Sequence, residues 1–246
     1  MLTNPTLTNP LVQQLIQRLN PNSYQDFLDL LYKDLDEIIN DLQQDREALL
    51  KKFKACNDDA KIFEDDVNNQ IVRSLKYKCY NSAHDKFHNG HVDIHVTIPG
   101  FEYTWLGESK IWNGVTYIDQ GFKQLNDAYS TGEDNDSAGG VLIYIVDTQL
   151  TANAMMEKWA NSLLTYDPSS PPNNVKGLGV YCEYPSNRKN SFISTHEHPY
   201  SGLEYNVRHM SIYLRHDPTV KTAVKKKKVK KVKVTAKTIN PDKKKE

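Results

Sequence analysis

The chain has 246 residues, with 31 Lys and Arg against 31 Asp and Glu. This length allows one domain with a substantial buried core and shorter appendages. It contains no run of 18 apolar residues and no N-terminal signal pattern, so we expect neither a membrane protein nor a secreted one. The three cysteines lie far apart without a CxxC pair, which favours free thiols in a reducing cytoplasm.

The net charge of zero hides an uneven distribution. Residues 221–246 contain 12 Lys and two acids, so the other 220 residues hold 19 basic and 29 acidic side chains. Lysine-rich blocks are usually solvated and bind nucleic acid by releasing counterions. We predict a helical extension over 1–56, a central domain over 57–217 and a flexible basic tail over 218–246. The tail lysines expected to contact nucleic acid are Lys225, Lys226, Lys227 and Lys228.

The N-terminal part is predicted to be helical. A short amphipathic helix is expected over 11–19, and a longer one from the N-cap Ser23 to about Lys54, with apolar residues at a 3.6-residue period. The acidic face of the longer helix is predicted to be solvated. The alternative is a surface for a homodimer or a companion subunit. This face comprises Asp29, Asp34, Asp36, Glu37 and Asp41.

The rest of the chain is organised around a predicted β-hairpin over 90–112. Apolar and polar residues alternate over 92–98, as in a half-buried strand, and a second alternating stretch follows over 101–112. Pro99-Gly100 between them indicates a turn, because Pro presets φ and Gly accepts a positive φ.

A turn centred on Pro99-Gly100 sets the register of this hairpin. It places Asp93 opposite Leu106 and diagonal to Glu108, so that Asp93, Glu108 and Lys110 share one face. Two carboxylates within about 5 to 8 Å repel unless a cation lies between them, and oxygen ligands suit Mg²⁺ or Mn²⁺. A nearby Lys can hold a water or offset charge on a phosphate.

This arrangement resembles the PD-(D/E)xK nuclease superfamily, which has the restriction-endonuclease-like fold. Asp93, Glu108 and Lys110 carry the resemblance, together with the segments ESKIWNG and GFKQLNDAY, which resemble a defence-associated branch. The resemblance covers roughly residues 60–216. It implies an α/β domain with a mixed central sheet flanked by helices.

The resemblance also implies roles for site residues. Asp93, Glu108 and the Ser109 carbonyl are expected to bind Mg²⁺, with Mn²⁺ as a substitute, while Lys110 orients the attacking water and stabilises charge. Gln124, on a helix expected over 119–130, would point back toward the catalytic strand.

An acid on the preceding helix, expected over 57–75, would complete the metal site. Glu64 matches best, with Asp65 and Asp66 as competitors. Acids near a helix N-terminus are also favoured by the helix dipole without any metal.

Four histidines precede and enter the hairpin. The spacing of His84, His88, His91 and His95 invites a zinc site, but no Cys pair completes one. His84 and His88 are predicted to lie in a loop. His91 and His95 are predicted to share the face of Asp93 and to contact nucleic acid, with plain surface histidines as the alternative.

The remaining elements complete a domain that alternates strands and helices. A strand is expected over 141–147, a helix over 151–164, and strands over 175–184 and 205–214.

The predicted function is an Mg²⁺-dependent endonuclease that hydrolyses phosphodiester bonds of double-stranded DNA in a bacterial anti-phage or restriction-type defence system. The alternative is a non-catalytic subunit that binds nucleic acid or a partner through the same fold.

Overall fold

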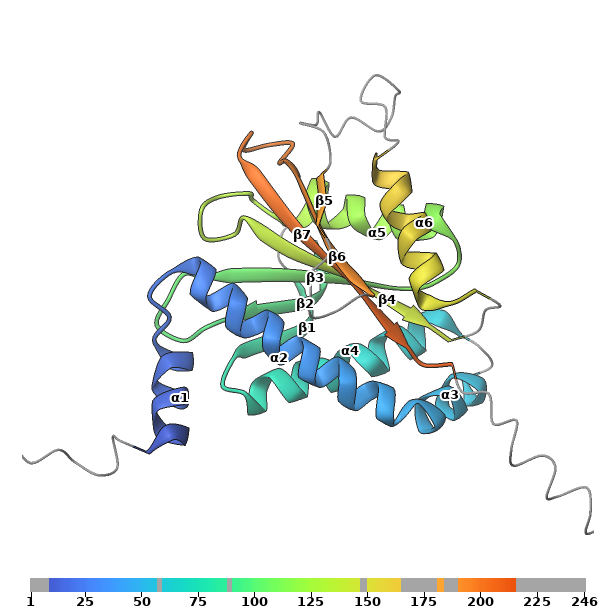
Figure 1. The fold of residues 1–246 in the computed structure, drawn as a ribbon, viewed down its shortest axis with the longest axis horizontal. Helices are drawn as coiled ribbons and strands as arrows, with labels where there is room; N and C mark the ends of the chain where they lie inside the picture. Colours follow the sequence, from blue (N-terminus) through green and yellow to red (C-terminus); the bar gives the residue numbers. More distant parts are fainter. Residues whose placement is uncertain are drawn as a thin grey trace, which may run out of the picture. The chain divides into compact units, whose positions relative to one another are not determined.

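The fold is seen in a computed structural model (Figure 1). The structure describes residues 9–56, 59–87, 90–146, 150–164, 181–183 and 190–215. By its contacts the chain divides after Arg215, so α1 to α3 belong to the same unit as the sheet. The predicted tail, with Lys225 to Lys228, and His88 lie outside the described residues.

A seven-stranded mixed sheet forms the centre, in the order β1-β2-β3-β4-β7-β6-β5. β3, β4 and β7 run parallel to one another, and the other neighbouring pairs are antiparallel. The strands are β1 (Asn81–Phe87), β2 (His91–Thr97), β3 (Thr104–Ile111), β4 (Ala138–Ile145), β5 (Tyr181–Glu183), β6 (Ser191–Glu197) and β7 (Glu204–Tyr213).

Helices cover both faces of the sheet, as Figure 1 shows. One apolar core lies between the sheet and α2 to α4, and a second lies between the sheet and α5, η1 and α6. All eight residues of β4 are buried, as expected for a central strand. The predicted α/β class with a mixed sheet is confirmed. The helices are α1 (Pro10–Leu19), α2 (Tyr24–Gln44), α3 (Arg46–Ala55), α4 (Ala60–Tyr77), α5 (Val115–Lys123), the π-helix η1 (Gln124–Tyr129) and α6 (Ala152–Leu164).

The N-terminal helices begin where their caps predict. Ser23 accepts a hydrogen bond from the Asp26 amide at 3.1 Å and caps α2, and Asp59 caps α4 through the Ile62 amide at 3.1 Å. The predicted single helix from Ser23 to Lys54 is instead two helices, which meet at Asp45. Within the described residues, no helix is long and apolar enough to cross a membrane.

The predicted solvated acidic face of α2 is wrong at two positions. Asp34 is fully buried, where it pairs with Arg18, lies 3.1 Å from the Lys78 ammonium and accepts the Tyr80 hydroxyl at 2.8 Å. Asp36 accepts two bonds from Arg208 on β7, at 3.0 and 2.9 Å. These acids tie α2 to its neighbours, and burial is tolerated because each charge has partners.

The predicted hairpin register and one loop also need correction. Ile94 pairs with Gly107 and His95 with Leu106, so Asp93 is not opposite Leu106. β3 begins only at Thr104, after a connection longer than a two-residue turn. The offset is two residues, which leaves each side chain on its predicted face. His84, predicted in a loop, lies in β1.

Candidate functional site

The end of β3 presents Glu108 and Lys110 toward α5. The Lys110 ammonium donates to Glu108 Oε1 at 2.5 Å, and both side chains are largely buried. A Cβ atom on Gly121 of α5 would lie 3.0 Å from Lys110 Cγ and 3.2 Å from Glu108 Cγ. The absence of a side chain at Gly121 therefore lets α5 pack closely over this pair.

Asp93 on β2 is joined to β3 by its side chain. Its Oδ2 accepts the Ser109 amide at 2.8 Å and the Ser109 hydroxyl at 2.8 Å. Backbone pairing of β2 with β3 runs from Thr97 to Ile94. The Ser109 amide lies beyond these pairs, and the Asp93 carboxylate accepts its hydrogen bond instead. The rotamer of Asp93 is thereby defined by β3 itself.

Glu64 is the acid of α4 that reaches the site. Its Oε1 accepts the Ile111 amide at 2.5 Å, next to Lys110. Its two competitors point elsewhere: Asp65 lies 3.3 Å from the His84 ring, and Asp66 lies 3.4 Å from the exposed Lys52 ammonium. The structure thus brings together Glu64, Asp93, Glu108 and Lys110 from three elements.

Burial and mutual repulsion raise the pKa values of two acids of this cluster, Glu108 and Glu64. Desolvation raises the pKa of Glu108 to about 8, and the Asp93 charge adds to the rise while Lys110 opposes it. Desolvation also raises the pKa of Glu64 to about 7, against the Ile111 hydrogen bond and Lys110. Burial lowers the pKa of Lys110, but the charge of Glu108 outweighs it and the net shift is upward. Strongly shifted acids gathered in one place are typical of a functional site.

The donor set fits a hard divalent cation in its chemistry. Carboxylate and carbonyl oxygens are the ligands that Mg²⁺ prefers, and the buried Glu108 Oε2 has no hydrogen-bond partner among the described residues. Within the same residues, however, no three His, Cys, Asp or Glu side chains converge as ready-made metal ligands. The Lys110 ammonium instead supplies the positive charge beside Glu108.

Gln124 lies at the junction of α5 and η1, and its side chain is exposed. Gly121, one turn earlier on α5, packs against Glu108 and Lys110. The acids of the site contribute to raised pKa values of two tyrosines of the same segment. Burial raises the pKa of Tyr117, and nearby Glu64 adds to it, while burial and then Glu108 raise the pKa of Tyr129.

The histidines take three different roles. His91 is exposed and lies 2.8 Å from Asp85, whereas His95 is buried on β2 opposite Leu106. His84 contacts the site backbone, because its Nδ1 lies 2.8 Å from the carbonyl oxygen of Asp93.

Sequence reasoning missed several residues around the site. Asn68, fully buried on α4, donates to the Ser109 hydroxyl at 2.8 Å and accepts from Tyr144 at 2.6 Å. One signal could have found it, since Asn68 lies four residues after Glu64 and so shares its helix face. His84 was singled out only for the spacing of the four histidines, and Tyr117 gave no comparable signal.

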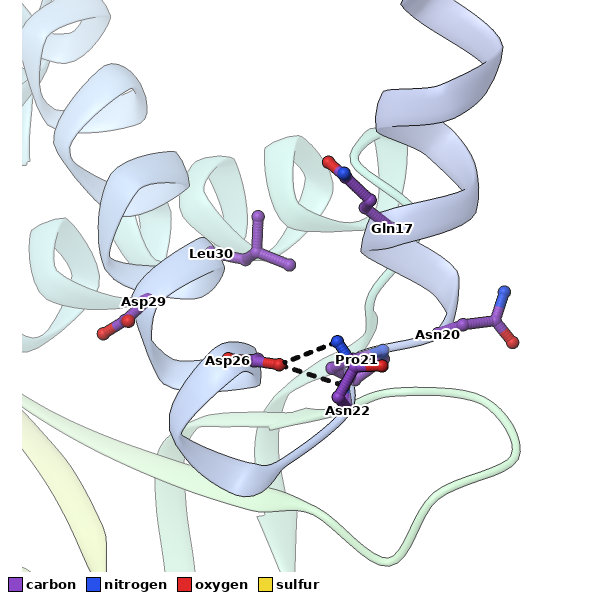
Figure 2. Close-up of a pocket in the computed structure, with 7 residues that line it drawn as sticks. All are labelled: Gln17, Asn20, Pro21, Asn22, Asp26, Asp29 and Leu30. Carbon is purple, nitrogen blue, oxygen red and sulfur yellow. Dashed lines mark hydrogen bonds between the residues drawn. The ribbon is translucent and has the colours of Figure 1, made fainter. Parts of the chain in front are cut away.

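Two surface hollows lie apart from these acids. Figure 2 shows one of about 250 Å³ between α1 and α2, where Asp26 Oδ2 accepts from Asn22 at 3.1 and 3.2 Å. Its carboxylates, Asp26 and Asp29, have no lysine beside them in its lining, so it lacks the acid–Lys combination. The other, of about 450 Å³, is lined by Arg46, Arg215 and Tyr213, at the same sheet edge as the end of β3.

Comparisons with models of protein families, with curated proteins and with solved structures found no match to the chain.

Proposed function

We propose that the chain is a metal-dependent nuclease with a restriction-endonuclease-like fold, which hydrolyses phosphodiester bonds of double-stranded DNA. One observation supports it most: Glu64, Asp93, Glu108 and Lys110 come from α4, β2 and β3 to one place. That place is near the carboxyl end of β3, which runs parallel to β4 and β7. Open α/β sheets commonly bind ligands at this edge.

The residues divide the work of hydrolysis. Asp93, Glu108, Glu64 and the Ser109 carbonyl would hold Mg²⁺, which supplies charge stabilisation and lowers the pKa of water. Lys110 would orient the attacking water and donate to a phosphate oxygen, where negative charge develops. α5, packed over the pair at Gly121, would keep bulk water from one side of the site.

Other features bear on the substrate, the cellular role and the partners of the proposed nuclease. The hollow lined by Arg46, Arg215 and Tyr213 lies at the same sheet edge as the end of β3, and its positive charge would favour the approach of a phosphate backbone. The proposed role in bacterial defence rests on the resemblance of ESKIWNG and GFKQLNDAY to one family branch, and the proposed cytoplasmic location rests on the three separated cysteines. A homodimer or a companion subunit would bind through α1, where Leu11, Leu15 and Ile16 are exposed.

A cleavage assay tests this function. Purified full-length protein is incubated with plasmid, linear DNA and RNA in Mg²⁺, Mn²⁺ or EDTA. We expect metal-dependent cleavage of DNA that Lys110→Ala and Asp93→Ala each reduce at least about a thousandfold. Lys51→Ala is the matched control, because Lys51 is exposed and forms an ion pair with Glu47, four residues earlier on the same helix. Full activity in either site variant would contradict the mechanism.

A non-catalytic subunit is the second candidate, and one observation favours it. Each acid already has a partner within the protein: Glu108 has Lys110, Asp93 has Ser109, and Glu64 has the Ile111 amide. Such pairs could serve stability alone. In that case no metal supports cleavage, DNA binding persists, and Lys110→Ala lowers the melting temperature by leaving buried Glu108 unpaired.

A further inference from the structure

Buried hydrogen bonds connect the interior of the sheet to Asp93. The Tyr144 hydroxyl donates to Asn68 Oδ1 at 2.6 Å, and Asn68 Nδ2 donates to Ser109 Oγ at 2.8 Å. Ser109 Oγ then donates to Asp93 Oδ2 at 2.8 Å. Tyr144, Asn68 and Ser109 are each fully buried, and they come from β4, α4 and β3.

The chemistry of Asn68 sets the direction of this hydrogen-bond chain. A tyrosine hydroxyl that donates to the amide oxygen turns the amide nitrogen toward Ser109. That nitrogen only donates, so Ser109 Oγ must accept from it. The hydroxyl hydrogen of Ser109 is then left for the Asp93 carboxylate.

Packing alone does not call for Asn68. Apart from Glu64, the other buried residues of α4 are apolar: Phe63, Val67, Ile71, Val72 and Leu75. A buried amide is costly unless it is hydrogen-bonded, and a Leu of similar size would suit this core. Both polar atoms of the Asn68 side chain instead form hydrogen bonds in the chain that ends at Asp93.

We propose that Asn68 is a positioning residue that acts through Ser109. It keeps the Ser109 hydroxyl donating to Oδ2 of Asp93, so that Oδ1 is the oxygen presented to a metal ion. The inference rests on the proposed function, since it concerns the geometry of the same metal site. Outer partners of this kind commonly change metal affinity about 10- to 100-fold when they are removed.

A double-mutant cycle on the full chain tests this, with Mn²⁺ affinity measured by calorimetry in the absence of DNA. We expect Ser109→Ala to weaken Mn²⁺ binding about tenfold or more, and Asn68→Leu to weaken it by a smaller factor. Because Asn68 acts through Ser109, the double variant should bind as weakly as Ser109→Ala and no more weakly. If Asn68→Leu does not fold, Tyr144→Phe replaces it in the cycle, because it removes only a hydroxyl. Tyr144→Phe should weaken Mn²⁺ binding severalfold.

The control is Ser82→Ala. Ser82 is also buried, but its hydroxyl donates to the Val72 carbonyl, at 2.9 Å, and not to an acid of the site. It should bind Mn²⁺ as the wild type does. Equal Mn²⁺ affinity in wild type, Ser109→Ala and Asn68→Leu overturns the positioning role and leaves the metal site intact. Strictly additive losses also overturn it. Failure of the wild type itself to bind any divalent metal instead overturns the proposed function.

Discussion

At the scale of single residues, Asp93 and Lys110 have opposite effects on a cation. Asp93 contributes a negative charge, whereas the Lys110 ammonium is a positive charge 2.5 Å from Glu108 Oε1. We therefore expect Asp93→Asn to weaken Mg²⁺ binding at least about tenfold, and Lys110→Ala to weaken it less or to strengthen it. Calorimetric titration of both variants checks this. The reverse order would mean that the two roles are wrongly assigned.

The shifted acids predict how stability changes with pH in the absence of metal. Between the ordinary value of 4.5 and the raised pKa values of about 7 for Glu64 and about 8 for Glu108, the folded state holds protons that the unfolded state has lost. The free energy of unfolding must then decrease as the pH rises through this window, by on the order of a few kcal/mol.

Glu108→Gln tests this dependence, because it keeps the shape of the neutral acid and cannot ionise. Melting temperatures in EDTA from about pH 5 to about pH 8.5 should fall more steeply for the wild type than for the variant. Mg²⁺ should reduce the difference by binding the ionised acids. Parallel curves for the two proteins in EDTA would contradict the assignment.

The spacing of residues along the two strands was enough to predict most of the site residues. Asp93, Glu108 and Lys110 share a face because strand side chains alternate, and a register error of two residues does not change that face. What could not be predicted depends on distant neighbours. Nothing in the helical periodicity of α2 reveals that Asp34 meets Arg18 and Tyr80 in the interior.

At the scale of elements, β1 is irregular where it passes Asp93. Asp85 has a φ of 51°, and the pairing of β1 with β2 skips Asp85 and Asp93. The His84 side chain fills this break, with Nδ1 at 2.8 Å from the Asp93 carbonyl oxygen and Nε2 at 3.3 Å from Asp65. Side chains thus replace backbone pairing beside the site.

His84→Asn and His84→Ala separate the two contacts of this ring. The Asn amide reaches the position of Nδ1 and can still donate to the Asp93 carbonyl, whereas Ala cannot. We expect His84→Ala to cost about 1 kcal/mol in urea unfolding and to lower cleavage activity, and His84→Asn to restore most of both. Asp65→Asn, which leaves the Nδ1 contact in place, is the control. If Ala and Asn behave alike, the contact with Asp93 has no role.

Secondary structure was predictable where periodicity is strong and failed where it is weak. The polar sequence of β1, NSAHDKF, carries no alternation, since its burial pattern has only Ser82 fully inside. The break at Asp45 between α2 and α3 and the π-helical turn of η1 were not predicted.

At the scale of the whole molecule, the charge of residues 221–246 predicts how DNA binding depends on salt. Twelve lysines against two acids should contribute affinity without sequence preference, since the affinity falls with salt in proportion to the phosphates neutralised. Deleting 221–246 should flatten the salt dependence and raise the DNA concentration needed for cleavage. Turnover at saturating DNA should barely change, because uniform binding does not lower the chemical barrier.

Binding isotherms at low and moderate salt, with and without residues 221–246, measure this effect. A version of the chain in which Lys225 to Lys228 are replaced by Gln is a matched control for length, and should lie between the two. Superimposable isotherms for the full and shortened chains would show that these lysines do not bind DNA.

The position of β7 has a consequence for how the protein is made. β7 is the last strand among the described residues, yet it pairs with β4 and β6 inside the sheet. Arg208, which binds Asp36 across 172 positions, also arrives with it. Until the ribosome has synthesised Glu204–Tyr213, the nascent chain exposes the open edge of the apolar strand β4, a surface prone to aggregation. Folding must wait for nearly the last described residues, so chains that terminate early should depend on chaperones or be lost to aggregation.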